Sequence, residues 1–414
     1  MGNILIHMLV NPHSEYDIFS NTDYTQMSDT FRRQNICCPN LGNRLWFQGL
    51  ISEISGEENT LCYFREEMSK DYINENFDMI VAPMANVFHA AFSDLLLRLT
   101  ERFKGIRIPV YVIACGVQAD GYDSLDTLCS VIKNPAQAFM KSVYETGGEF
   151  ALRGYFSKEF FDRMGYSSAV VTGCPSLYQL GRDLRISNDK VAEEIFRPLV
   201  NGNVNEYIAM AQKYPKAAFF DQDRCFHILH DPNQPLNIRS LVHYYGFEPT
   251  QWLLSERVKM IPNMNDWWNY LQDSGFHFSF GSRIHGSIMP ILAGIPAAME
   301  PQDSRTREMA EFFEIPTVER KGKSLYELYL ETDYSAFNKS FAQKYDAYEH
   351  FLVSHGIVEK CNSHNQFLIR RGVDVTAGNH LQLEKMNQAF QKQRWLWKNY
   401  DHILRWKRNM TRKG

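Results

Sequence analysis

The sequence predicts an α/β protein made of two doubly wound domains. Its 414 residues are more than one hydrophobic core usually organises. Short apolar runs that end in turn residues alternate with helix-like stretches, which is typical of βα units around a mainly parallel sheet. The runs form two sets, with a boundary near residues 180–195. We therefore expect an N-terminal domain over residues 1–185, a second domain over residues 186–330 and a helical C-terminal extension over residues 331–414.

The first set of apolar runs predicts the sheet of the N-terminal domain. The expected strands are residues 4–10, 77–83, 108–116 and 168–175, and stretches with helical periodicity lie at residues 86–103 and 155–165. In an open parallel sheet, ligands bind beyond the carboxyl ends of the strands. The residues that follow these strands are therefore candidates for a binding site.

The second set predicts a further sheet of the same kind. The expected strands are residues 216–220, 275–280 and 294–300, and the expected helices are residues 265–275 and 305–314. Two such domains facing each other would enclose a cleft, which is a favoured place for a substrate.

Composition and charge narrow the class of protein. The net charge of −4 argues against nucleic acid as the main partner. The eight cysteines form no CxxC pair, which favours a reducing compartment over a disulfide framework. No apolar run approaches about 18 residues, and no signal-peptide pattern opens the chain. We expect a cytoplasmic protein.

The end of the chain mixes basic and aromatic residues. Residues 391–414 carry Trp395, Trp397 and Trp406 among many lysines and arginines. A helix of this kind can lie on an anionic membrane surface, which would make the protein peripheral at the inner face of the cell membrane. The alternative is a helix whose tryptophans pack against a domain and whose basic face is solvated.

Several familiar motifs are absent from the sequence. It has no GxGxxG and no GxSxG, and the GKS at residues 322–324 lacks the first glycine of a phosphate-binding loop. The segment HILHD at residues 227–231 offers two histidines and an aspartate to a metal, but ordinary histidines explain this spacing equally well. We expect no metal site.

The segment GSRIHGSIMPILAGIPA at residues 281–297 is the most informative stretch. It predicts a strand end, a sharp turn and a helix whose first N–H groups and dipole point beyond the sheet, where they favour an anion. Arg283 adds a planar fork suited to a carboxylate or phosphate. His285, with an unperturbed pKa of about 6.5, can accept or donate a proton near neutral pH. The alternative is structural: the histidine caps the helix and the arginine pairs with a surface carboxylate.

Two further arginines stand at equivalent places. Arg153 precedes the expected helix 155–165, and Arg305 or Arg307 begins the expected helix 305–314. Cations at several strand ends, together with one histidine, predict a site for a small polyanion.

These elements resemble the polysaccharide pyruvyl transferase family. The segment SRIHGSIMPILAGIPA (282–297) is similar to that family's SRxHG…AxxxGxP element. Weaker similarities cover roughly residues 38–318 and lie in NLGN (40–43), APMANVF (82–88), ACGVQA (114–119), LRGYFSKEFFDRMG (152–165) and VTGCPSL (171–177).

The resemblance implies a GT-B-like fold, in which two Rossmann-like domains face each other across a cleft. It implies transfer of pyruvate from phosphoenolpyruvate onto two hydroxyls of a sugar, which gives a ketal in a capsule, exopolysaccharide or lipid-linked precursor and releases phosphate. Phosphoenolpyruvate is the co-substrate, and neither a cofactor nor a metal is implied. His285 is the expected general acid or base. The other residues carried over are Arg153, Arg283, Arg305, Gly286 and Ser287 on the donor side, and Asn40, Asn43, Asn86 and Gln118 on the acceptor side.

Three positions depart from the family pattern. Asn43 and Gly154 each replace an aspartate, and Arg305 replaces a lysine. Two alternatives are open, because the same arginines and helix N-terminus could hold a diphosphate and because the departures at Asn43 and Gly154 could remove catalysis. One is a GT-B glycosyltransferase that uses a nucleotide sugar, and the other is a relative that binds glycan or anion without catalysis. The sequence does not indicate the acceptor sugar, its linkage positions or the oligomeric state.

Overall fold

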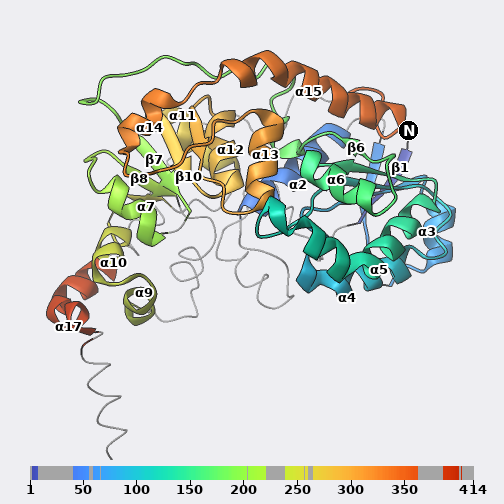
Figure 1. Ribbon diagram of the computed structural model, residues 1–414, viewed down its shortest axis with the longest axis horizontal. Helices are drawn as coiled ribbons and strands as arrows, with labels where there is room; N and C mark the ends of the chain where they lie inside the picture. The colour runs from blue at the N-terminus through green and yellow to red at the C-terminus, as the bar shows by residue number, and fades with distance from the viewer. Residues whose placement is uncertain are drawn as a thin grey trace, which may run out of the picture.

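In the computed structural model, the chain forms two parallel β-sheets with helices packed against them (Figure 1). This confirms the predicted α/β class with two Rossmann-like parts. The structure describes residues 2–7, 41–55, 59–65, 67–202, 204–220, 238–255, 257–259, 264–361, 386–400 and 402. None of the helices in these residues is long and apolar enough to cross a membrane.

The first sheet has six strands in the order β2-β1-β3-β4-β5-β6, all paired in parallel. Its strands are β1 (Gly2–Ile6), β2 (Asn59–Tyr63), β3 (Met79–Pro83), β4 (Val110–Cys115), β5 (Glu149–Leu152) and β6 (Val170–Val171). Every residue of β3 and β4 is buried, because helices cover both faces of the sheet.

Helices connect these strands in the βα pattern that the sequence predicts. They are α2 (Leu41–Ile54), α3 (Lys70–Asn76), α4 (Ser93–Phe103), α5 (Leu125–Tyr144) and α6 (Tyr155–Arg163), with 3-10 turns η1 (Ala90–Phe92), η2 (Tyr122–Ser124) and η3 (Pro175–Leu177). In α4, Leu96, Leu99 and Phe103 recur at helical spacing and are the buried residues of that helix. We call the part from β1 to η3 the first unit.

The second sheet has five strands in the order β11-β10-β7-β8-β9, again all parallel. They are β7 (Pro198–Asn201), β8 (Ala218–Phe220), β9 (Val258–Lys259), β10 (Phe278–Gly281) and β11 (Ala297–Met299). The associated helices are α7 (Val204–Ala211), α9 (Ile238–Tyr245), α10 (Phe247–Leu253), α11 (Met264–Ser274), α12 (Ile284–Leu292), α13 (Ser304–Phe313) and α14 (Leu325–Glu331). We call the part from β7 to α14 the second unit.

The described residues of the C-terminal extension are mainly helical, as predicted, and its long helix α15 (Ser335–Ser354) lies along both units (Figure 1). Tyr348 of α15 stacks on Tyr178 of the first unit at a centroid distance of 4.7 Å. Beyond α15, the carbonyl of Ile357 accepts a hydrogen bond from Asn59 Nδ2 at 2.9 Å. The extension therefore fastens the second unit back onto the first. The short helix α17 (Arg394–Lys398) lies farther along the chain.

Expected and observed elements differ mainly at their ends. The expected helix 86–103 becomes a turn followed by α4, because residues 86–89 form a loop that pairs Phe88 with Val117. The expected strand 168–175 shrinks to β6, because Gly173 adopts a left-handed φ of 81°. Strands β2, β5, β7 and β9 were not predicted, since each is short and lacks a long apolar run. The chain leaves the first sheet after Val171 and enters the second at Pro198, and the domain boundaries at residues 185 and 330 remain predictions.

Candidate functional site

The turn at the start of α12 is held by the neighbouring strand β7. Asn201 at the end of β7 is buried, and its Oδ1 accepts a hydrogen bond from the backbone N–H of Arg283 at 3.2 Å. Gly281 ends β10, where a Cβ atom would lie 1.9 Å from the Asn201 carbonyl oxygen. The close approach of β7 and β10 therefore requires glycine at 281 and fixes Arg283 as the N-cap residue of α12. The sequence prediction missed Asn201, because β7 itself was not recognised.

His285 is the second residue of α12 and is buried, with 9% of its surface exposed. Its Nε2 atom makes no hydrogen bond to any part of the chain that the structure describes. Burial and the charges of Arg153 and Arg305 lower the pKa of His285 to about 3. The imidazole is therefore neutral at neutral pH in this environment, and the role of His285 in proton transfer remains a prediction.

Arg153 follows β5 in the first unit and is 3% exposed. Its backbone N–H donates to the Cys115 carbonyl at 2.9 Å, while its Nε and Nη2 atoms are buried without a hydrogen-bond partner among the described residues. A Cβ atom at Gly116 would lie 3.0 Å from Arg153 Cδ and 2.9 Å from the Ala85 carbonyl. Gly116 therefore makes room for the arginine side chain, which packs across the end of β4.

Arg305 is the second residue of α13 and pairs with the N-cap of its own helix. Its Nε and Nη2 atoms donate to Asp303 Oδ2 at 3.0 and 2.5 Å. The same carboxylate accepts from the Thr306 backbone N–H at 3.0 Å and closes a capping box. Asp303 thus holds Arg305 in place, and the positive charge of Arg305 still lowers the pKa of His285.

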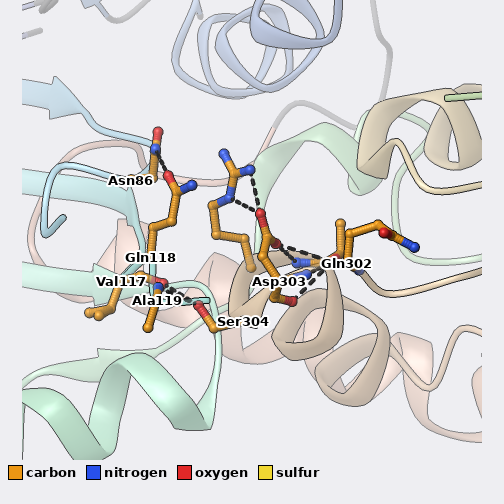
Figure 2. A network of polar contacts seen from close by, with 9 residues as sticks. Asn86, Val117, Gln118, Ala119, Gln302, Asp303 and Ser304 are labelled. Carbon is orange, nitrogen blue, oxygen red and sulfur yellow. Dashed lines mark hydrogen bonds and ion pairs between the residues drawn. The ribbon is translucent and has the colours of Figure 1, made fainter. Parts of the chain in front are cut away.

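The start of α13 is bonded to the carboxyl end of the first sheet (Figure 2). Ser304 Oγ accepts a hydrogen bond from the Ala119 backbone N–H at 2.9 Å and donates to the Val117 carbonyl at 3.2 Å. Between these residues, Gln118 projects toward Asn86, whose Nδ2 donates to Gln118 Oε1. The two side chains predicted for the acceptor side therefore bind each other, and they lie at the junction of the two units.

Glu308 is a buried acid of α13 that the sequence prediction missed. It is 1% exposed, and its Oε1 and Oε2 atoms accept hydrogen bonds from the Ser157 backbone N–H at 2.6 Å and the Ser157 hydroxyl at 2.9 Å. Burial raises the pKa of Glu308 to about 7, although the bonds from Ser157 and the charge of Arg153 lower it. Helix periodicity alone places Glu308 on a face of α13, and only the packing of α13 against α6 shows that the face is buried.

Glu308 also explains why position 154 is glycine. A Cβ atom at Gly154 would lie 2.4 Å from Glu308 Cγ. Gly154 has φ −177°, an extended conformation that any residue adopts, so the requirement is for space and not for backbone freedom. The departure from the family pattern thus coincides with a carboxylate supplied from the second unit.

The remaining predicted residues fall into three groups. Gly286 and Ser287 are buried in the first turns of α12, and Ser287 Oγ has no hydrogen-bond partner among the described residues. Arg283 is half-buried at the start of the same helix. Asn43 lies in α2, where its side chain is outside the description, and Asn40 and the segment 227–231 lie outside the described residues. Across the described ranges, no group of three or more histidine, cysteine or acidic side chains is arranged to hold a metal.

The comparison with protein families decides the relationship. The model of the family described as "Polysaccharide pyruvyl transferase" matches residues 88–304, which is just over half of the chain. The chain belongs to the polysaccharide pyruvyl transferase family. The match contains both Arg153 and His285 and ends one residue before Arg305. No curated protein shows a significant match.

Solved structures resemble the chain only distantly. Staphylococcus aureus MnaA with UDP is 9% identical over 88% of this chain and 100% of its own, with a TM-score of 0.44. A putative UDP-N-acetylglucosamine 2-epimerase from Listeria monocytogenes is 10% identical over 95% and 96%, with a TM-score of 0.36. The glycosyltransferase SnogD from Streptomyces nogalater is 11% identical over 84% and 94%, with a TM-score of 0.30. Similarity at this level carries no argument about function.

Proposed function

We propose that this protein transfers pyruvate from phosphoenolpyruvate onto two hydroxyls of a sugar, in a surface polysaccharide or its lipid-linked precursor, with release of phosphate. The observation that carries the proposal is a pair of buried groups from the two units. Arg153 Nε and Nη2 and His285 Nε2 are buried without partners among the described residues, and the charge of Arg153 reaches the imidazole. Buried polar atoms are rarely left unsatisfied, so these three atoms mark a site that receives a ligand.

The charges of the site suit an anionic donor. Phosphoenolpyruvate carries a carboxylate and a phosphate, and both are matched by guanidinium groups and by a helix N-terminus. Arg153 and the first turn of α12 supply such donors, and Arg305 adds a third positive charge nearby. Because these residues supply the positive charge, the proposal requires no cofactor.

The reaction needs three proton transfers besides the new bonds: one to carbon 3 and one from each sugar hydroxyl. Protonation of carbon 3 of phosphoenolpyruvate makes carbon 2 electrophilic, and one sugar hydroxyl adds to carbon 2 and loses its proton. The carbon–oxygen bond to phosphate then breaks, the phosphate takes the electron pair, and the second hydroxyl adds and loses its proton. One hydroxyl proton thus replaces the proton given to carbon 3, and the other leaves on phosphate.

His285 is the group best placed to carry a proton in this sequence. Its pKa is lowered by burial and by Arg153 and Arg305, so it is neutral before the donor binds. A bound carboxylate and phosphate would oppose these cations and raise its affinity for a proton. In the occupied site His285 therefore becomes a competent acid or base, while Arg153 holds the donor and stabilises departing phosphate.

The test is phosphate release from phosphoenolpyruvate with a panel of glycan acceptors. We expect release only with an acceptor, and we expect Arg153→Met to lower kcat/KM by about 100-fold or more, since a buried charge contact is lost. Arg163→Met is the matched control, because Arg163 lies on the exposed end of α6 and pairs with Asp126 and Glu159. Full activity in His285→Ala would show that the proton role is wrong. Thermal stabilisation by a nucleotide sugar, and none by phosphoenolpyruvate, would favour a glycosyltransferase instead.

We also propose a peripheral contact with the inner face of the cell membrane through the region of α17. Trp395 is 74% exposed and has Arg394 beside it. Trp397 instead packs near Tyr400, with ring centroids 5.9 Å apart. The two alternatives from the sequence thus apply to different tryptophans: Trp397 packs on the protein, and Trp395 is free to enter an interface.

A further inference from the structure

The buried guanidinium of Arg153 lies near a buried carboxylate that it does not bind. Glu308 reaches from α13 to the first turn of α6, where both of its oxygens accept hydrogen bonds from Ser157. The charge of Arg153 acts on Glu308, yet Arg153 Nε and Nη2 make no hydrogen bond within the described residues. The carboxylate of Glu308 therefore balances the charge of the Arg153 guanidinium, while Nε and Nη2 of Arg153 can still donate hydrogen bonds to a ligand.

Such a balance of charge is needed before an anion binds. A buried guanidinium without a nearby negative charge costs several kcal/mol. His285 is neutral and contributes none, and the Asp303 carboxylate is already engaged by Arg305. Glu308 is the buried acid whose charge offsets that of Arg153.

Binding of an anion changes the balance of charge between Arg153 and Glu308. Once a carboxylate or phosphate binds Arg153, the Glu308 carboxylate faces added negative charge, and like charges in a dry site favour the protonated acid. We propose that Glu308 is the internal counter-ion of Arg153 and takes up a proton from solvent when the anion binds. The identity of that anion as phosphoenolpyruvate rests on the proposed function.

The position of Glu308 on the pH scale makes this exchange possible near neutrality. Burial raises its pKa to about 7, so it is mostly ionised at pH 8 and ready to be protonated. Anion binding also raises the affinity of His285 for a proton, but this share of the uptake is retained in Glu308→Gln, so the difference between the two proteins reports on Glu308. Burial raises the pKa values of Cys115 and Tyr122 further above their ordinary range. Glu311, one turn along α13, is half-exposed and pairs with Arg307.

The expected size of the effect follows from the pKa of about 7. If the bound state needs Glu308 protonated, binding is weakened about tenfold at pH 8 and about twofold at pH 7 relative to a protein with a neutral residue there. Affinity of the wild type for the anion should therefore rise as pH falls from 8.5 to 7, and that of Glu308→Gln should rise clearly less. Glutamine keeps the shape of the side chain and can still hydrogen-bond Ser157.

The experiment is calorimetric titration with phosphoenolpyruvate at pH 8, in two buffers with different ionisation enthalpies. A phosphate monoester has its second pKa near 6, so the ligand is fully ionised there. We expect the wild type to take up about half a proton or more on binding. Glu308→Gln should take up clearly less and bind about tenfold tighter. Glu311→Gln keeps the Glu308 carboxylate and its bonds from Ser157 and should behave as the wild type, which separates the charge of Glu308 from that of its neighbour.

The outcomes distinguish this inference from the proposed function. Binding of phosphoenolpyruvate with equal proton uptake in wild type and Glu308→Gln overturns the counter-ion role and leaves the function standing. Binding of sulfate alone, with uptake that depends on Glu308, supports the counter-ion role and removes phosphoenolpyruvate as the donor. Binding of neither anion overturns both. If Glu308→Gln does not fold, a level affinity of the wild type between pH 7 and 8.5 is sufficient to refute the inference.

Discussion

Replacing Gly154 by alanine should destabilise the protein through a single contact. The added Cβ atom would lie 2.4 Å from Glu308 Cγ and 3.0 Å from Glu308 Cδ. Glu308 has little freedom to withdraw, because two hydrogen bonds from Ser157 hold its carboxylate. Overpacking of this kind costs about 1–3 kcal/mol, and loss of a hydrogen bond to a charged group costs about 1.5–3 kcal/mol more.

We therefore expect Gly154→Ala to lower the free energy of unfolding by at least about 2 kcal/mol. For a cooperative unit of about 200 residues, this corresponds to a Tm decrease of roughly 4–8 °C in a calorimetric scan. The matched background is Glu308→Ala, in which the contact is absent and the same glycine substitution should cost almost nothing. The reasoning is refuted if Gly154→Ala changes stability by less than about 0.5 kcal/mol, or if its cost is equal in both backgrounds.

Three further predictions concern pH and the membrane. Burial and the charges of Arg153 and Arg305 lower the folded-state pKa of His285 to about 3, below its unfolded value, so the protein loses stability as pH falls from about 6.5. Between pH 7 and 4, Tm should therefore fall less in His285→Gln than in the wild type, and equal decreases in Tm would contradict this. Burial raises the folded-state pKa of Glu53 to about 8, so ionisation costs stability as pH rises from about 4.5; Glu53→Gln should raise Tm at pH 8, and an unchanged Tm would count against it. Trp395→Ala should reduce co-sedimentation with vesicles that contain phosphatidylserine. The control Val131→Ala, which removes an exposed apolar side chain from α5, should not reduce it, and equal binding by both variants would exclude the membrane role of Trp395.

The fold class was predictable because it depends on local patterns. Apolar runs followed by turn residues identified β1, β3, β4 and β10, and helical periodicity identified α6, α11 and α13 within two residues at either end. The strands β2, β5, β7 and β9 were missed, because none stands in a long apolar run, and such a strand is defined by its neighbours in the sheet rather than by its own composition.

The candidate site was predictable only in part. A strand, a sharp turn and a helix with Arg283 and His285 at its start could be recognised along the chain, as could the arginine that follows β5. The partners of these residues come from other elements. Asn201 fixes the turn from β7, and Glu308 approaches Arg153 from α13, so neither lies near its partner in the sequence.

The amino-acid sequence by itself determined the α/β class, the family and the residue types of the candidate site. These follow from periodicity and from short motifs, which are properties of neighbouring residues. Only the tertiary structure decided the charge state of that site. Burial and nearby charges lower the pKa of His285, burial raises that of Glu308, and two donor atoms of Arg153 have no hydrogen-bond partner among the described residues. Desolvation and electrostatic interaction depend on distances in space, which the order of residues along the chain does not specify.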